Sequence, residues 1–158
     1  KFKSSDIPFA SAEQRDDVLH QPVTANGRTF NVCGVNVGNP VVCVFVDKFE
    51  DDWREIGRSL ETHEAFPDRA NIVFVRVIDD ENIEIKIWER GVGETSSSGT
   101  CVSGAAALSA YIGYTSKKMA VHTDGGITEF LWRDDGEMII TGRADLAYCG
   151  KFNAEVRA

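Results

Sequence analysis

The alanine-rich stretch GTCVSGAAALSAY, residues 99–111, constrains the fold of this chain more than any other feature. It is predicted to be helical, and apolar residues such as Ala105, Leu108 and Ala110 occupy nearly every side of that helix. A helix that is apolar nearly all round is stable only when it is buried. We therefore expect a central helix surrounded by β-strands.

Runs of alternating or continuous apolar residues predict those strands. The turn Asn26-Gly27 separates two alternating runs within residues 22–38 and predicts a hairpin. The almost wholly apolar run VVCVFVD, residues 41–47, suits a strand buried on both faces. Residues 71–79 and 82–88 alternate strictly and predict a second hairpin with one buried face. Further strands are expected after the central helix, over residues 117–123, 127–135, 137–142 and 147–152.

A second helix of a different kind is predicted over residues 51–66. Trp53, Ile56, Leu60 and His63 recur there at helical spacing and form one stripe, so this helix should be amphipathic and lie on the outside. Many strands, one buried helix and one amphipathic helix indicate an α+β fold in which the sheet wraps round the buried helix.

Composition excludes several classes of partner. The length of 158 residues fits one domain, and 42% hydrophobic content is ordinary for a globular protein. A net charge of −8, with 17 scattered basic residues, argues against a nucleic-acid partner. No apolar run approaches the ~20 residues that span a bilayer, and the first residues lack a hydrophobic signal core, so no membrane partner is expected. A cytoplasmic protein is the simplest interpretation.

The cysteines indicate no metal site. Cys33, Cys43, Cys101 and Cys149 lie far apart without CxxC spacing, so neither a zinc site nor a redox motif is predicted. Most of them are expected to be buried free thiols.

The start of the alanine-rich helix has the composition of an anion site. Ser98 is a natural N-cap, and Gly99 lets a ligand approach the backbone closely. The first N–H groups of a helix lack intrahelical partners and carry about half a positive charge, so they favour a carboxylate or phosphate.

Ordered motifs across the chain resemble the C-terminal half of diaminopimelate epimerase. They are Gly38-Asn39-Pro40, Phe66-Pro67, Arg69-Ala70-Asn71, WERGVGET at 88–95, Gly99-Thr100 and Thr141-Gly142. The resemblance implies a cofactor-independent isomerase that converts LL- to meso-diaminopimelate in lysine biosynthesis. It also implies a mixed sheet curled into a barrel around the central helix, with the active site in the cleft between two such domains.

The expected domain organisation has two sources. Residues 1–22 have little periodicity and two prolines, which indicate a linker or an extended lead-in. The resemblance makes residues 23–158 the C-terminal domain, with the N-terminal half absent from this chain. That half supplies an asparagine and the first of two catalytic cysteines in such enzymes, so this chain alone is expected to be inactive. The oligomeric state stays open, a homodimer included.

The resemblance assigns five residues to substrate binding. Asn39, Asn71 and Arg90 match residues that hold the amino-acid group distant from the reacting carbon. Gly99 and Thr100 would offer backbone N–H groups to the reacting carboxylate and stabilise a carbanionic intermediate. Taken singly, three of them also have a structural explanation: Asn39 could shape a turn, Asn71 could cap a strand, and Arg90 could form a surface ion pair with Glu89.

The catalytic positions depart from the family pattern. Ser98 stands where the family has its second catalytic cysteine, and Glu89 matches the carboxylate that assists that thiol. A serine hydroxyl is far less acidic than a thiol, although Glu89 could polarise it. Val41 replaces a histidine, and Cys101 stands where the family usually has glycine.

These departures leave three functions open. The first is an amino-acid epimerase or racemase that binds a zwitterionic substrate between its halves. The second is a one-thiol, dehydratase-like relative in which Ser98 only orients the substrate. The third is a non-catalytic paralogue that binds an amino acid.

Overall fold

A computed structural model describes residues 1–10 and 16–151. It contains a short 3₁₀ helix, two α-helices and nine strands. Both predicted hairpins are confirmed, whereas the 3₁₀ helix and the short strand over residues 93–95 were not predicted. The elements are η1 (Ser4–Asp6), β1 (Val18–Ala25), β2 (Arg28–Asn36), β3 (Pro40–Phe45), α1 (Trp53–Glu61), β4 (Asn71–Asp79), β5 (Asn82–Glu89), β6 (Gly93–Thr95), α2 (Gly99–Ile112), β7 (Lys118–Thr123), β8 (Gly126–Trp132) and β9 (Met138–Thr141).

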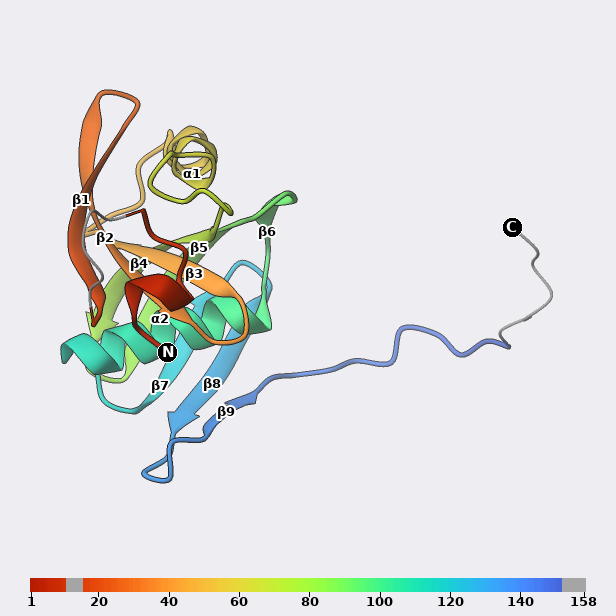
Figure 1. Ribbon diagram of the computed structural model, residues 1–158. Coiled ribbons are helices and arrows are strands. Elements are labelled where there is room, and N and C mark those ends of the chain that lie inside the picture. Colours follow the sequence, from red (N-terminus) through yellow and green to blue (C-terminus); the bar gives the residue numbers. More distant parts are fainter. Residues whose placement is uncertain (11–15, 152–158) are drawn as a thin grey trace.

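The nine strands form one mixed sheet (Figure 1). Its order is β1-β2-β3-β4-β5-β7-β8-β9, and β6 pairs with β5 beside this path. Two neighbouring pairs are parallel: β3 with β4, joined through α1, and β5 with β7, joined through β6 and α2. The remaining pairs are antiparallel. An α+β fold with two α-helices and a mixed sheet is therefore confirmed.

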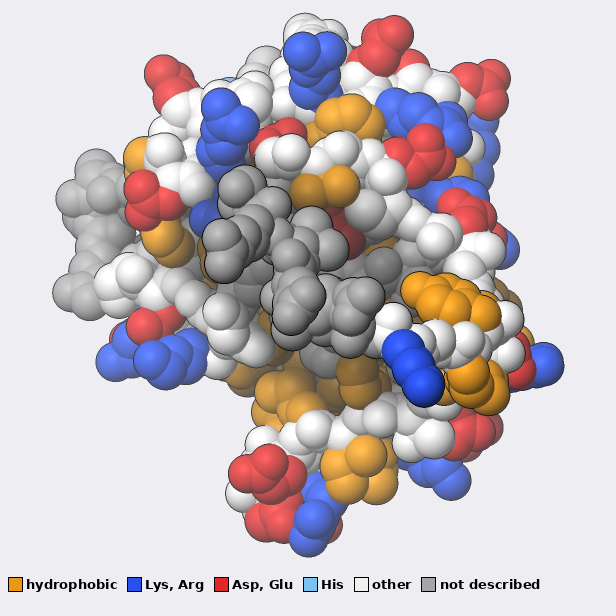
Figure 2. All heavy atoms as spheres, turned by 90° about the vertical axis from the view of Figure 1, so that its right-hand side faces the viewer, with side chains coloured by type: hydrophobic (Ala, Val, Ile, Leu, Met, Phe, Trp, Pro, Cys, Tyr) orange, Lys and Arg blue, Asp and Glu red, His pale blue; other side chains and the backbone are white. Residues whose placement is uncertain are grey.

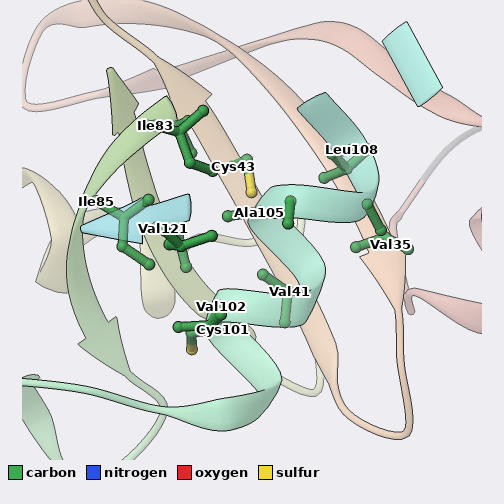
Figure 3. Packing of buried hydrophobic residues seen from close by; sticks show 14 of the residues in the cluster. Val35, Val41, Cys43, Ile83, Ile85, Cys101, Val102, Ala105, Leu108 and Val121 are labelled. Carbon is green, nitrogen blue, oxygen red and sulfur yellow. The ribbon is translucent and has the colours of Figure 1, made fainter. Parts of the chain in front are cut away.

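Helix α2 is buried as predicted, and the sheet wraps part of the way round it. It contacts strands β2, β3, β4, β5, β7, β8 and β9. Figure 3 shows side chains of these strands, Val41, Cys43 and Ile85 among them, gathered against Ala105 and its neighbours on the helix. The helix ends at Gly113, which takes the left-handed conformation that favours glycine (φ +88°). Neither helix of the described chain is long and apolar enough to cross a membrane.

Helix α1 covers the opposite face of the sheet. Its residues Trp53, Ile56 and Leu60 pack with Ile72 and Phe74 of β4 in a second core. Strand β4 is consequently buried on both faces over its first five residues, so the single buried face predicted for it is wrong. The predicted helix is also too long, because α1 ends at Glu61 and His63 lies in the following turn.

The sheet is not closed into a barrel, which corrects that part of the expected architecture. Strands β1 and β9 lie at opposite ends of the strand order and do not pair. The strand expected over residues 147–152 is absent from residues 147–151, the described part of that range, so up to residue 151 no strand follows β9 to bridge the gap. Regular structure also starts before residue 22, because β1 begins at Val18 and Ile7 is already buried.

Three of the four cysteines are buried and free, as expected. These are Cys33, Cys43 and Cys101, and all three have side chains in the core around α2. The exposed thiol is Cys149, which lies beyond β9.

Candidate active site around Arg90 and the start of helix α2

The turn between β5 and β6 presents Arg90 at the surface. Its guanidinium donates from Nη2 to Oδ1 of Asn39 (3.1 Å) and from Nη1 to the backbone oxygen of Asp68 (3.0 Å). An arginine side chain has five N–H groups, so three remain for a ligand as far as the described residues are concerned. The bonds to Asn39 and Asp68 fix the plane of a group that binds carboxylates bidentately.

Asn71 bonds to the backbone of the same turn. Its side chain is only 2% exposed, its Nδ2 donates to the backbone oxygen of Pro40 (3.0 Å), and its Oδ1 accepts the Arg90 backbone N–H (3.0 Å). It thus joins the start of β3, next to Asn39, to the backbone of Arg90. The structure brings Asn39, Asn71 and Arg90 together; direct contact of Asn71 with a substrate stays a prediction.

Sequence reasoning missed Glu61, the last residue of α1. Its carboxylate is buried, and it accepts hydrogen bonds from the Trp88 indole N–H and from the Gly91 backbone N–H, both 2.8 Å long. Arg69 lies 3.5 Å from the same carboxylate. The signal was present in the spacing, since Glu61 follows Trp53 by eight positions and therefore lies on the buried side of the helix.

The start of α2 is open to a ligand. Ser98 occupies the N-cap position in an extended conformation (φ −156°, ψ 122°), but its side chain makes no capping hydrogen bond. The expected cap is therefore wrong in its side-chain contact, because Ser98 Oγ lies 3.4 Å from Thr100 Oγ1 instead. The first intrahelical bond runs from the Val102 N–H to the Ser98 oxygen, so the backbone N–H groups of Gly99 and Thr100 precede the helical ladder.

Glu89 and Cys101 form the rest of this neighbourhood. Glu89 accepts a hydrogen bond from the Thr95 hydroxyl (2.7 Å). Burial raises the pKa of the Cys101 thiol to about 11; the Ser98 hydroxyl lowers this pKa, the Glu89 carboxylate raises it, and the Thr100 hydroxyl lowers it. Cys101 is fully buried and neutral near pH 7, so it supplies no thiolate in place of the missing one.

The site residues fall into two groups, one around the Arg90 guanidinium and one at the start of α2. The two groups are joined by the peptide chain at residues 89 and 90, and no hydrogen bond between their side chains is present within the described residues. Glu89 belongs with the start of α2, and Arg90, the next residue, belongs with Asn39 and Asn71. A hollow of about 770 Å³ lies elsewhere, between the β2–β4 strands and Tyr114, and none of its lining residues belongs to the site. We place the site by its chemistry, because the hollow is open and both of its arginines, Arg28 and Arg76, are paired with carboxylates.

A family model described as diaminopimelate epimerase matches residues 33–147, which include every site residue. The chain belongs to the diaminopimelate epimerase family. Among its relatives, the diaminopimelate epimerase of Caldanaerobacter subterraneus subsp. tengcongensis is 34% identical over 151 residues, covering 95% of this chain and 54% of that protein. The diaminopimelate epimerase of a Chelativorans species is 37% identical over 138 residues, covering 86% of this chain and 44% of that protein.

Solved structures share the fold at low identity. A methylitaconate-delta-isomerase superimposes with a TM-score of 0.52 at 16% identity, over 78% of this chain and 48% of the other. A Bacillus anthracis protein of the PhzF phenazine-biosynthesis family gives 0.51 at 19% identity, over 70% and 38%. Fold similarity at this level carries no statement about the reaction.

The chain spans about half the length of the diaminopimelate epimerases that it matches. Two positions that the resemblance assigns to proton transfer, Ser98 and Val41, stay predictions. Ser98 lies at the helix start where the family resemblance places a thiol, and Val41, where it places a histidine, is fully buried against α2.

Proposed function

We propose that this chain is the C-terminal half of an amino-acid isomerase that acts on diaminopimelate or a close analogue. The observation that carries the proposal is the fixed guanidinium of Arg90. It is oriented by Asn39 and Asp68, and its backbone is held by Asn71. A planar cation held in this way suits the distal carboxylate of a dicarboxylic amino acid, which it would bind through two parallel N–H···O bonds.

The start of α2 would receive the carboxylate at the reacting carbon. Removal of an α-proton places negative charge on that carbon and its carboxylate. The backbone N–H groups of Gly99 and Thr100 would stabilise this charge, because they have no cap and the helix dipole is positive there. Asn71 could add a further contact to the distal end of the substrate.

Proton transfer would then depend on the other half of the protein. In the proposed reaction a thiol of that half removes the α-proton from one face, and an acid on the opposite face returns one. Ser98, polarised by Glu89, occupies the opposite face here, so we expect inversion to be slow compared with a two-thiol enzyme. No cofactor takes part in this scheme.

The other half of the protein would pack on the face that carries the end of β9. Figure 2 shows hydrophobic side chains gathered in the lower part of this face, at the height of β8 and β9. Ile139 and Ile140 of β9 are 42% and 44% exposed, and Ile140 lies over Gly99 at the start of α2. Apolar residues exposed beside the site are expected to be covered when the cleft is complete.

The experiment is to incubate the complete protein with LL-diaminopimelate in deuterated water and to follow the α-carbons by NMR. We expect meso-diaminopimelate to form, with deuterium at the inverted carbon. Loss of water from a hydroxylated analogue without inversion would instead indicate the dehydratase-like reaction. Absence of both exchange and water loss would contradict an enzymatic function.

One observation favours a second candidate, an amino-acid-binding paralogue without activity. The start of α2 offers a serine hydroxyl and a buried thiol with a pKa of about 11, so neither supplies a base near neutral pH. Calorimetry distinguishes this candidate from the enzyme, because it predicts that diaminopimelate binds without exchange of its α-protons.

A further inference from the structure

We propose that Glu61 is a positioning residue that holds Arg90 in the orientation needed to grip a carboxylate. The inference rests on the proposed function and adds to it a residue outside the family motifs quoted above. Glu61 does not contact the proposed substrate group itself. It acts through the backbone of the β5–β6 turn.

The contacts of Glu61 lie on both sides of Arg90. One carboxylate oxygen accepts the indole N–H of Trp88, two residues before Arg90, and the other accepts the backbone N–H of Gly91, the residue directly after it. Asn71 accepts the N–H of Arg90 itself. The backbone is thus fixed at Arg90 and at its following neighbour, so the side chain leaves the turn in one direction.

A carboxylate is required for this arrangement because two N–H groups point at it. Both oxygens of a carboxylate accept hydrogen bonds, whereas a glutamine offers one oxygen and one NH₂ group. A glutamine at position 61 would therefore place an N–H donor against Trp88 or Gly91. It would also lose the ion pair with Arg69, whose backbone lies in the left-handed region (φ +58°) directly after Asp68.

Glu61 thereby contacts the residue that follows Arg90 and the residue that follows Asp68, one of the two anchors of the guanidinium. Gly91 follows Arg90, and Arg69 follows Asp68, whose backbone oxygen accepts the Arg90 Nη1 hydrogen bond. The side chain of Glu61 is 7% exposed, so solvent offers little replacement for these partners. A buried charge that loses its partners rearranges its surroundings, and small displacements of a binding group reduce binding strongly.

The test compares Glu61→Gln with Glu55→Gln, which removes the same charge from an exposed position on the same helix. In ¹⁵N-labelled complete protein, we expect Glu61→Gln to shift the Trp88 indole and Gly91 amide signals and to increase the mobility of the Arg90 Nε–H. We expect roughly tenfold weaker binding of diaminopimelate with unchanged binding of lysine, which has no distal carboxylate. Glu55→Gln should match the wild type in every readout.

A second variant keeps the proposal testable if Glu61→Gln does not fold. Trp88→Phe removes one of the two hydrogen bonds and keeps the ring, so the Arg90 Nε–H should become more mobile, by less than in Glu61→Gln. Unchanged Arg90 signals in the folded variant overturn the role of Glu61, whether or not diaminopimelate binds. Changed Arg90 signals in a protein whose wild type does not bind diaminopimelate support that role and overturn the proposed function instead.

Discussion

Arg90 donates a hydrogen bond from Nη2 to the side-chain oxygen of Asn39 over 3.1 Å, although 51 positions separate the two residues. The contact joins the turn before β3 to the turn after β5. Asn71, at the start of β4, bonds to the backbone on both sides of this contact, at Pro40 and at Arg90. The three residues form one assembly because β3, β4 and β5 are neighbours in the sheet.

Asn71→Leu should destabilise the domain. Leucine has a similar volume but removes the partner of the buried Pro40 oxygen and of the half-buried Arg90 N–H; an unpaired buried group costs about 1–3 kcal/mol. We expect the free energy of unfolding in urea to fall by roughly 2–4 kcal/mol. Asn31→Leu, at an exposed position on β2, is the control and should stay within about 0.5 kcal/mol of the wild type.

Gly104→Ala should also destabilise the domain, although helices usually prefer alanine to glycine. A Cβ at Gly104 would lie 2.8 Å from both Cβ and Cγ1 of Val41, whose branched side chain has little freedom to move. Overpacking of this kind costs about 1–3 kcal/mol, which exceeds the helix gain of about 1 kcal/mol. Thermal unfolding should show a lower Tm, and the neighbouring Ser103→Ala should leave it nearly unchanged. A Tm above that of the wild type would contradict close packing of α2 on β3.

Much of this fold could be predicted because its signals are local. Alternation predicted β5, a turn of Asn26-Gly27 predicted the first hairpin, and apolar residues on all sides predicted a buried α2. The remaining features depend on distant contacts. Burial of both faces of β4 requires knowing that α1 packs on it, and an open sheet requires knowing that β9 pairs with β8 alone among the described strands.

For the candidate site, the sequence predicted which residues take part but not how their side chains are bonded. The motif residues Asn39, Asn71 and Arg90 were found and do lie together. The two hydrogen bonds of the Asn71 amide, the missing cap of Ser98 and the buried carboxylate of Glu61 were not found. Each depends on side-chain geometry between segments that are far apart in the chain, which spacing alone does not fix.

Cys101 should make stability fall at alkaline pH. Its thiol has a pKa raised from 9.0 to about 11 in the fold, so the unfolded chain loses its proton first. Above pH 9 the native state therefore binds more protons than the unfolded state, and the free energy of unfolding decreases as pH rises towards 11. Below pH 9 the thiol is protonated in both states, so it does not lower the free energy of unfolding there.

Urea unfolding of wild type and Cys101→Ala at pH 8 and pH 10 measures this effect. The difference in unfolding free energy between the two proteins should change by about 1.4 kcal/mol in favour of the variant at pH 10. Cys149→Ala, which removes an exposed thiol, should follow the wild type. An identical pH dependence for Cys101→Ala and wild type would show that the thiol is not shielded as the structure indicates.

Ser98→Cys should increase α-proton exchange by the complete protein. A thiol at the start of α2 would lie beside uncapped backbone N–H groups, which lower the pKa of a cysteine and favour its thiolate. Exchange of the α-hydrogen of diaminopimelate in deuterated water should rise at least tenfold, a conservative bound below the roughly 10²- to 10⁴-fold typical of general acid–base catalysis. Ser97→Cys adds a thiol one position earlier, at an exposed residue, and should not increase exchange. Equal rates for the two variants would remove Ser98 from the proton-transfer path.

The most direct test of the account is the preference of the complete protein for diaminopimelate over lysine, measured by calorimetry for wild type and Arg90→Gln. The two ligands differ in the distal carboxylate, and a charged hydrogen bond is worth about 1.5–3 kcal/mol, or roughly a 10- to 100-fold preference. Arg58→Gln removes an equal charge from an exposed position on α1 and serves as the control. We predict that wild type and Arg58→Gln prefer diaminopimelate and that Arg90→Gln loses the preference while it still binds lysine. An unchanged preference in Arg90→Gln would contradict the assignment of Arg90 as the residue that binds the distal carboxylate.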